Sequence, residues 1–457
     1  MEEGACAMSG CEAKVPALRF RMSHAEAQRR GEGGCVSSSA ECRARNPAVP
    51  WVKKRLGDFG KPFNGLNGKT KADFGHGEGR YVTYLGIFSN PIVGRESCAP
   101  IEVDTSQNEV KRGDVFFTTS SETPDEVGMS AVWLDDAANT YLNSFCFGFR
   151  PNGDNDSEFL AYLFRSLRFR DDMAFLAQGI SRYNISKGRV MNISVALPSD
   201  SDEQRRIGSF FRLLDALIAG REKALEKLEA LKKSMLLKMF PQGDATVPEV
   251  RFKGFAGDWE KKRLGDSFNL EVSTNTLSRA ELSQTGMVRN VHYGDVLIKY
   301  GSIVDVSNEA IPFIADCQFK CDRKNKLMDG DVIMADTAED ETAGKVTEIR
   351  GIGDKLLVSG LHTIVLRPNE KYGDGFLGYC LNAPGYHESL SSVMQGAKVL
   401  SINKGVLSDT DFLAPSLPEQ QKIGAYFRSL DALLASRREE IGKLQQMKKA
   451  LLERMFV

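Results

Sequence analysis

The chain of 457 residues lacks an excess of charge of either sign: 60 lysine and arginine residues face 61 aspartate and glutamate residues, and the formal net charge is −1. A nearly neutral chain offers nucleic acid no global attraction, so DNA binding would have to come from local basic patches or from basic partner subunits. The chain also lacks any apolar run near the roughly 18 residues that a membrane span needs. Its beginning shows no basic region followed by an apolar stretch, which argues against a signal peptide. These absences predict a cytoplasmic protein with no membrane partner.

Paired cysteine motifs and clustered histidines are missing as well. The cysteines form an odd set without CxxC spacing, and we interpret them as reduced thiols rather than metal ligands. They are Cys6, Cys11, Cys35, Cys42, Cys98, Cys146, Cys317, Cys321 and Cys380. The histidines His76, His292, His362 and His387 stand alone in the sequence. The acidic segments 122–126 and 336–341 lack the lysine partner of a metal-dependent nuclease, and no NPPY-like methyltransferase motif is present. We therefore predict no catalytic residues, no metal site and no cofactor of the chain's own.

What the chain does contain is one helical segment written twice. Residues 203–240 and 419–456 align without a gap and share half of their positions. The phrase WVKKRLGD at 51–58 likewise recurs as WEKKRLGD at 259–266. The chain is therefore two tandem copies of one module.

Each repeated helix carries apolar residues at alternating spacings of four and three, the pattern of a coiled-coil seam with one local change of phase. The predicted helix-packing residues are Ile207, Phe211, Leu214, Ile218, Leu225, Leu228, Ile423, Phe427, Leu430, Leu434, Ile441 and Leu444. Two equal stripes in one chain can bury each other, so we expect the helices to pack together. At about 1.5 Å per residue each helix would run roughly 55 to 60 Å, which suits a spacer.

The remaining sequence mixes short β-rich runs, glycine-rich turns and occasional helices, as is typical of compact α+β domains. The strands that we expect include Tyr81–Ile87, Val115–Thr119, Val332–Met334 and His362–Leu366. The predicted order is a tail with a disordered insert at 1–50, interrupted by a repeat fragment at 15–20, then a variable domain at 51–200, a helix at 201–241, a second variable domain at 242–415 and a second helix at 416–457. The fold class is α+β, with two tandem domains and two long helices.

Two matched phrases, QGISRYNISK at 178–187 and QGAKVLSINKG at 395–405, combine positive charge with short amide and hydroxyl donors. Such groups contact phosphates and base edges in DNA. A glycine-flanked lysine loop and a basic, partly aromatic neighbourhood add further candidates. The candidate DNA-binding residues are Lys69, Thr70, Lys71, Arg182, Tyr183, Asn184, Ser186, Lys187, Lys299, Tyr300, Lys398, Ser401, Asn403 and Lys404. The alternatives are a polar turn before a strand for the two phrases and a solvated face for the Lys299 neighbourhood.

Within this set the two residue types have different expected roles. We expect Lys187 and Lys404 to contact phosphates. Asn184 and Asn403 could offer a donor and an acceptor to an adenine edge. The same asparagine amide could instead cap the turn that follows it.

The duplicated helix, the phrase APSLPEQQKIG that opens its second copy, and two diverged domains in alternation resemble the specificity subunit of type I restriction-modification systems. The phrases GKTKADFGHGEGRYVTY, KRGDVFFTTSSETPDEVG and MDGDVIMADTAEDETAGK are also similar to that family. The resemblance covers nearly the whole chain apart from 1–14 and 21–50. It implies two target-recognition domains, each reading one half of a bipartite DNA site and held apart by an antiparallel pair of helices.

The same resemblance implies a non-catalytic subunit that binds double-stranded DNA and docks two methyltransferase subunits and, for cleavage, two restriction subunits. S-adenosylmethionine, ATP and magnesium would then belong to those partners. Because the stretches 59–175 and 267–390 align poorly, we expect an asymmetric site with two unlike halves. The rival interpretation is a non-catalytic coiled-coil scaffold whose variable domains bind proteins.

Overall fold

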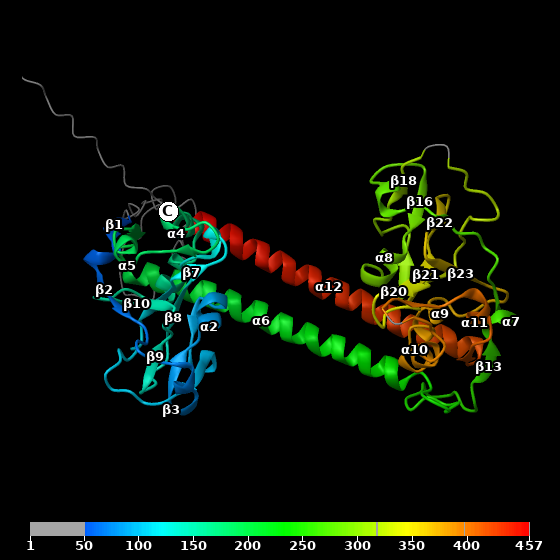
Figure 1. Ribbon diagram of the computed structural model, residues 1–457, viewed down its shortest axis with the longest axis horizontal. Coiled ribbons are helices and arrows are strands. Elements are labelled where there is room, and N and C mark those ends of the chain that lie inside the picture. Colours follow the sequence, from blue (N-terminus) through cyan, green and yellow to red (C-terminus); the bar gives the residue numbers. More distant parts are fainter. Residues whose placement is uncertain (1–50, 317–318, 397, 457) are drawn as a thin grey trace, which may run out of the picture. The chain divides into compact units, whose positions relative to one another are not determined.

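The computed structural model describes residues 51–316, 319–396 and 398–456 (Figure 1). The predicted tail and insert at 1–50 lie outside these residues. The chain forms two compact units. Among the described residues, unit 1 comprises Trp51–Arg221 with Glu440–Phe456, and unit 2 comprises the residues from Glu222 to Glu439.

Two long helices dominate the described chain. Helix α6 covers Ser201–Lys238 and α12 covers Leu417–Met455, each within three residues of the predicted bounds. The main-chain carbonyl of the residue before each helix accepts from the first turn, Asp200 from the Gln204 amide at 3.2 Å and Ser416 from the Glu419 amide at 2.9 Å. The Asp200 carboxylate also caps α6 by accepting from the Asp202 amide at 2.9 Å. Each unit contains one half of each helix, so neither helix belongs to a single unit.

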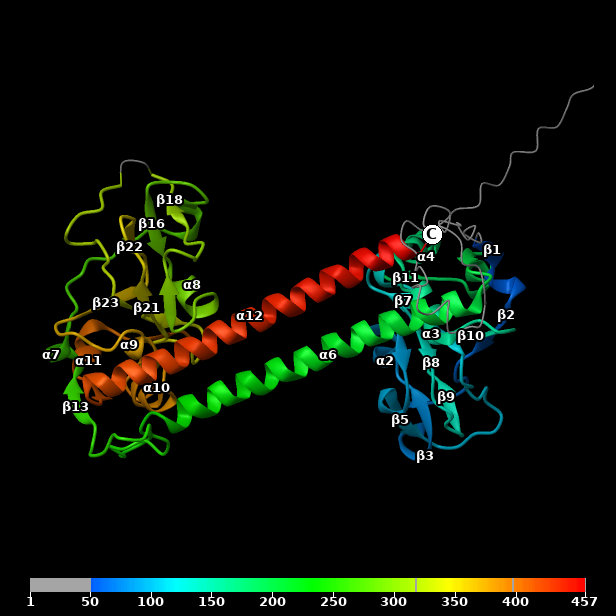
Figure 2. The same cartoon turned by 180° about the vertical axis from the view of Figure 1, so that it is seen from behind.

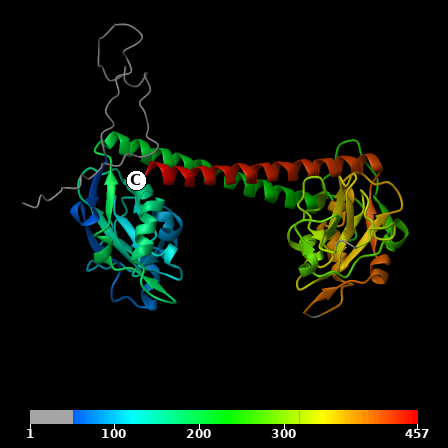
Figure 3. The same cartoon turned by 90° about the horizontal axis from the view of Figure 1, so that it is seen from above.

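Within each unit the two helix halves run antiparallel. In unit 1 Lys448 Nζ lies 2.5 Å from an Asp215 carboxylate oxygen, and Arg221 lies 3.2 Å from Glu440. In unit 2 Lys232 pairs with Asp431, and Arg438 with Glu229 at 2.6 Å. Residue numbers rise along one helix as they fall along its partner. Figure 3 shows the two helix halves, green and red, along one side of the strands in each unit.

Unit 1 is built on a five-stranded sheet in the order β2-β10-β6-β8-β4 and a three-stranded sheet in the order β5-β3-β9. The strands are β2 Gly60–Asn64, β10 Cys146–Pro151, β6 Val115–Thr118, β8 Ser130–Trp133, β4 Ile92–Val93, β5 Cys98–Ile101, β3 Phe74–Val82 and β9 Thr140–Leu142. Two short pairs complete it: β1 Val52–Arg55 with β12 Ser194–Leu197, and β7 Ser120–Ser121 with β11 Tyr183–Asn184. Its short α-helices are α2 Tyr84–Ser89, α3 Ser157–Leu163, α4 Leu167–Leu176 and α5 Lys187–Val190. Figure 2 shows β3, β5 and β9 at the end of unit 1 away from the helix pair.

Unit 2 has the same plan. Its five-stranded sheet has the order β14-β23-β19-β21-β17, and a four-stranded sheet has the order β15-β18-β16-β22. The strands are β14 Phe268–Asn269, β23 Thr363–Pro368, β19 Val332–Ala335, β21 Val346–Arg350, β17 Ile303–Asp305, β15 Leu282–Ser283, β18 Phe313–Ile314, β16 Val288–Val291 and β22 Leu356–Ser359. Short pairs join β13 Glu260–Arg263 to β25 Asp411–Ala414, and β20 Thr337–Ala338 to β24 Leu400–Ser401. The helices are α7 Leu264–Ser267, α8 Tyr293–Ile298, α9 Phe376–Cys380, α10 Pro384–Ser391 and α11 Lys404–Ser408.

The two five-stranded sheets correspond strand by strand although their sequences align poorly. In both, the last pair of strands in this order is parallel: β8 with β4 in unit 1 and β21 with β17 in unit 2. An ion pair to a buried aspartate recurs at the same place: Arg150 binds Asp114 at 2.6 Å, and Arg367 binds Asp331 at 2.7 Å. The pattern of buried strands has therefore been kept while most side chains between them have changed.

Each core joins the sheet to both helices. In unit 1 the Phe211 ring lies 5.1 Å from Tyr162 and 5.8 Å from Phe456, the residue that follows α12. In unit 2 the Phe427 ring lies 5.0 Å from Tyr379, and Phe240 after α6 fills the same role. Burial of such aromatic side chains contributes about 2 to 3 kcal/mol each. The helix pair is thus part of each hydrophobic core.

These contacts refine the expectations for the packing residues and strands. Ile207, Phe211, Ile423 and Phe427 are buried in the cores of the units as well as between helices, whereas Leu225, Leu228 and Leu444 are only half-buried.

The expectation of a strand over Tyr81–Ile87 was wrong: β3 ends at Val82 and α2 begins at Tyr84. The Thr83 hydroxyl accepts from the Gly86 amide at 3.1 Å, and this cap starts the helix.

Candidate nucleic-acid interface

The two matched phrases form the same short β-ribbon in each unit. In unit 1 Tyr183 lies opposite Ser121 in the β7–β11 pair, and in unit 2 Ser401 lies opposite Thr337 in the β20–β24 pair. We call these the ribbons. Their loops close in the same way, with the amide of Gln178 donating to the Asn184 carbonyl at 2.9 Å and its counterpart in unit 2 donating at 3.0 Å.

A glycine shapes each ribbon loop. Gly179 has φ +143° and Gly396 has φ +124°, values that L side chains rarely adopt. A Cβ at either position would lie 2.0 or 1.9 Å from the carbonyl oxygen of Arg182 or Val399. The QG dipeptide common to both phrases is therefore explained by the turn it makes.

In unit 1 the candidate residues around the ribbon differ in exposure and in hydrogen-bond partners. Arg182 is exposed, and its Nε donates to the Ser120 hydroxyl at 2.8 Å. Tyr183 is half-buried, and Asn184 is exposed. Ser186 occupies the N-cap position of α5 without a side-chain capping bond. The Lys187 ammonium donates to the Asn64 side chain at the end of β2, so this lysine already fastens two elements together.

In unit 2 the corresponding residues are placed alike. Lys398 is exposed, and the Ser401 hydroxyl contacts the Gln395 carbonyl at 3.5 Å. The Asn403 side-chain oxygen accepts from the Val406 amide at 2.9 Å and so caps α11. The Lys404 ammonium donates to the Leu270 carbonyl at 2.6 Å. The side-chain oxygen of Asn403 therefore acts as a helix cap. The residue is exposed, and its side-chain amide nitrogen is not used by that cap.

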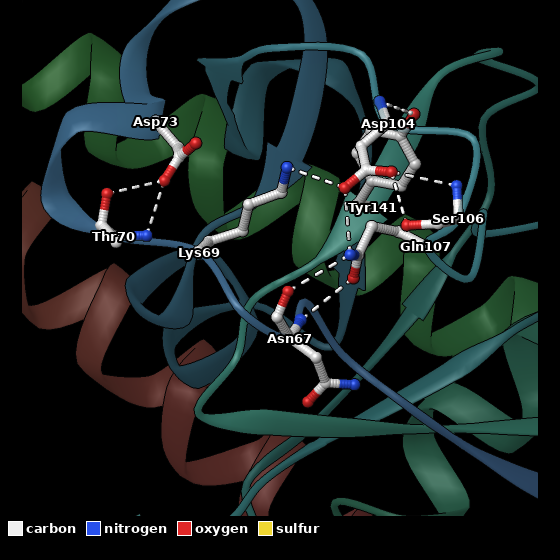
Figure 4. A network of polar contacts seen from close by, with 8 residues as sticks. All are labelled: Asn67, Lys69, Thr70, Asp73, Asp104, Ser106, Gln107 and Tyr141. Atoms are coloured by element: carbon white, nitrogen blue, oxygen red, sulfur yellow. Dashed lines mark hydrogen bonds and ion pairs between the residues drawn. The ribbon is translucent and has the colours of Figure 1, made fainter.

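The lysine loop of unit 1 is held by an internal ion pair (Figure 4). Lys69 Nζ lies 2.8 Å from the Asp104 carboxylate, which also accepts from the Ser106 hydroxyl at 2.6 Å and from Gln107 at 3.1 Å. The hydrogen bond to Asp104 raises the pKa of Lys69, and the same bond holds the pKa of Asp104 well below its usual range. Lys69 is therefore neutralised by a local partner.

The two neighbours of Lys69 differ from it. The Thr70 amide and hydroxyl donate to Asp73 at 2.6 and 2.8 Å, which caps a short 3-10 turn. Lys71 is exposed on that turn. Of this predicted group, Lys71 is the residue best placed to meet a phosphate.

The prediction for Tyr300 was wrong. Its side chain is 2% exposed and belongs to the core of unit 2, because it follows α8 and packs beneath β19 with apolar neighbours. A ring in this position cannot reach DNA without unfolding of the core. Lys299 is exposed, and its ammonium donates to the Ala310 carbonyl.

Among the described residues, no three histidine, cysteine or acidic side chains gather where they could hold a metal ion. The described cysteines Cys98, Cys146, Cys321 and Cys380 are free thiols. No helix in the described part of the chain is long and apolar enough to cross a membrane.

Comparison with known proteins decides the family. The sequence model described as the type I restriction modification DNA specificity domain matches the chain twice, over residues 48–230 and 256–446. The chain belongs to the type I restriction-modification specificity family. Specificity subunits of these systems are non-catalytic and recognise DNA.

Two curated relatives come from Methanocaldococcus jannaschii. The type I restriction enzyme MjaVIII specificity subunit is 23% identical over 301 residues, which are 64% of this chain and 68% of that protein. The putative type I restriction enzyme MjaX specificity subunit is 25% identical over 201 residues, 44% of this chain and 45% of that protein.

Solved structures of specificity subunits share the fold. The S subunit from M. genitalium matches with a TM-score of 0.52 and 14% identity, over 90% of this chain and 98% of that chain. A chain from a structural study of complex assembly in a type I system matches with a TM-score of 0.54 and 19% identity, over 88% of this chain and 96% of that chain.

Sequence reasoning missed two positions beside each ribbon of this specificity subunit. The Thr119 amide donates to the Phe145 carbonyl at 3.0 Å in unit 1, and the Asp336 amide donates to the His362 carbonyl at 3.2 Å in unit 2. Phe145 and His362 are both exposed. The signal was weak, because His362 stands alone in the sequence and Asp336 lies in an acidic run that resembles a turn.

Proposed function

We propose that this specificity subunit reads an asymmetric, two-part DNA site, with unit 1 reading one half and unit 2 the other. The observation that supports this proposal most directly is the pair of ribbons. The same backbone occurs twice, and the exposed side chains on it differ between the units, as with Arg182 and its counterpart Val399. Different side chains on equal backbones favour different base edges.

The proposal assigns chemistry to partner subunits. Two methyltransferase subunits would dock on the specificity subunit and bring S-adenosylmethionine. Two restriction subunits would bring ATP and magnesium for cleavage. Local cations would supply the phosphate contacts, since the chain as a whole has a formal net charge of −1. The exposed Lys71 and Lys398 suit that role.

The test is to express the full chain with its methyltransferase partner in a host without other DNA methyltransferases and to sequence the methylated positions. We expect one motif made of two unlike half-sites around an unspecified spacer. A perfect palindrome would contradict the asymmetry. Methylation without any motif would contradict DNA reading by the two units. A complex that assembles but binds random DNA as tightly as selected DNA would favour the scaffold interpretation.

A further inference from the structure

The two units place different side chains at matched positions next to their ribbons. The match is fixed by main-chain hydrogen bonds: the Thr119 carbonyl accepts from the Ile185 amide at 3.0 Å, and the Asp336 carbonyl accepts from the Ile402 amide at 2.9 Å. Thr119 therefore corresponds to Asp336, and Phe145 to His362. Unit 1 has a neutral hydroxyl and an exposed apolar ring there, while unit 2 has a carboxylate and an imidazole.

In unit 2 these groups form a compact polar cluster. An Asp336 carboxylate oxygen accepts from the Thr337 hydroxyl at 2.7 Å and lies 3.5 Å from Nδ1 of His362. The Tyr293 ring meets the imidazole edge to face at a centroid distance of 5.3 Å. The side chains of Asp336 and His362 are 24% and 47% exposed, so both can still be reached by solvent while Thr337 and Tyr293 contact them.

The backbone at His362 adds a second, independent observation. His362 has φ +53°, and among the described residues it shares positive φ with only one other non-glycine residue, Asn139. Histidine is tolerated in this region, but such conformations cost energy and concentrate at functional sites. With the backbone in this conformation, the imidazole Nδ1 lies 3.5 Å from the Asp336 carboxylate. The hydroxyl of Thr337, the imidazole of His362 and the positive φ of His362 thus all lie at one half-buried carboxylate.

The charge of Asp336 decides which part of DNA it could meet. A carboxylate repels phosphates and accepts hydrogen bonds, so a base edge that carries an amino group suits it. In the major groove this group is N4 of cytosine or N6 of adenine, whereas guanine O6 and thymine O4 are acceptors. The exposed Lys398 on the loop of the same ribbon can hold the neighbouring phosphate.

We propose that Asp336 is a specificity-determining residue of the second half-site, where it accepts from the amino group of a cytosine or an adenine, and that His362 positions it. This inference rests on the proposed function, because it presumes that unit 2 reads DNA. In unit 1 the same place carries Thr119 and Phe145, which offer no carboxylate and suit an apolar contact such as a thymine methyl.

The experiment selects bound fragments from a DNA library with the full chain assembled with its methyltransferase partner. Asp336→Asn keeps the size of the side chain but adds a donor, so bases with an acceptor edge should now be tolerated. We expect enrichment of guanine or thymine at one position of the second half-site to rise by roughly tenfold or more, with the first half-site unchanged. Wild-type preference for cytosine over adenine, or the reverse, names the base.

Two further variants complete the design. His362→Phe introduces the unit 1 residue and should weaken discrimination at the same position. Glu339→Gln removes one exposed negative charge just after β20, three residues from Asp336, and should leave every position unchanged. Melting and assembly of each variant are measured alongside.

The outcomes separate cleanly. Unchanged half-sites in both Asp336→Asn and His362→Phe would overturn the inference, as would a change in the first half-site or a general loss of specificity in a folded, assembled variant. A wild-type complex that enriches no two-part site would instead contradict the proposed function itself.

Discussion

The buried carboxyl of Glu348 makes the stability of unit 2 depend on pH in a direction opposite to that of a salt-bridged acid. Glu348 lies on β21, is 4% exposed, and accepts from the main-chain amides of Gly375 at 2.7 Å and Gly378 at 2.9 Å. Burial raises its pKa from the ordinary 4.5 to about 7, although the two amide bonds lower it. Nearby Asp374 raises the pKa further, and Arg350 lowers it.

The sign follows from proton linkage. The folded state binds the Glu348 proton more tightly than the unfolded state does, so this stabilisation is fully present below pH 4.5 and is lost as the pH rises to about 7. A pKa difference of about 2.5 at 1.36 kcal/mol per pH unit corresponds to about 3 kcal/mol. Unit 2 should therefore lose about 2 to 3 kcal/mol of unfolding free energy between pH 5 and pH 8 from this group.

Glu348→Gln removes the titration but keeps one acceptor oxygen. At pH 5 the variant should be less stable than wild type by about 1 to 3 kcal/mol, because one amide of the α9 turn loses its partner. At pH 8 this gap should close or reverse, because the wild-type carboxylate is then charged and buried. The difference between the two proteins isolates Glu348 from every other titrating group.

The assay is urea unfolding of the chain with fluorinated tryptophan, followed by NMR. Trp259 reports on unit 2, while Trp51 and Trp133 report on unit 1 and act as an internal control. Exposed Glu271→Gln is the matched variant in unit 2. Parallel pH profiles for wild type and Glu348→Gln at Trp259 would refute the reasoning.

Other perturbations test the remaining contacts. Arg251→Ala should cost roughly 3 to 5 kcal/mol of unfolding free energy in unit 2, because it strips the bidentate partner at 2.7 and 2.8 Å from Glu419, whose side chain is 1% exposed; an unchanged melting temperature would argue against it. Gly396→Ala should distort the ribbon of unit 2 and abolish reading of the second half-site while assembly persists, and selection of an unaltered site would show that the ribbon plays no part. Lys404→Ala should make the slope of log affinity against log salt less steep by about one unit. An unchanged slope would show that Lys404 only binds the Leu270 carbonyl and does not contact a phosphate. Lengthening α6 and α12 together by seven residues should widen the spacer by about three base pairs with both half-sites intact, and an unaltered spacer would end the idea of a helical ruler.

The sequence predicted the elements whose residues interact over short distances. The helices of 38 and 39 residues follow from a periodic stripe with polar caps, which are local signals. The two matched phrases were singled out by their charged, amide and hydroxyl residues, but the pairing of each phrase with a second short strand was not predicted. A strand over Val332–Met334 was expected because consecutive apolar residues are typical of a fully buried strand, and β19 extends it by one residue to Ala335. Tyr81–Ile87 read as a strand from composition, but a single capping hydroxyl at Thr83 outweighed that propensity.

Contacts between distant residues could not be predicted in this way. Lys69 reads as a free cation in the sequence, and only the fold brings Asp104 within 2.8 Å of it. Tyr300 reads as an aromatic beside a lysine, yet the end of α8 turns its ring inward. The correspondence of Asp336 with Thr119 rests on main-chain hydrogen bonds, which leave no trace in a comparison of side chains.

The two units show which residues the shared fold constrains and which it releases. Tyr162 donates to Asp215 at 2.9 Å, and Tyr379 donates to Asp431 at 2.7 Å. In each unit a lysine of the antiparallel helix binds this aspartate: Lys448 lies 2.5 Å from Asp215 in unit 1, and Lys232 pairs with Asp431 in unit 2. A partly buried hydrogen-bonded triad of this kind tolerates no change of partner, since each loss strands a polar group. The positions beside the ribbons lie outside the hydrophobic cores, with Phe145 and His362 exposed and Thr119 and Asp336 half-buried, so a hydroxyl, a carboxylate, a phenyl ring or an imidazole can occupy them without cost to the core. Two copies of one module can therefore keep one fold and still present two different surfaces beside their ribbons.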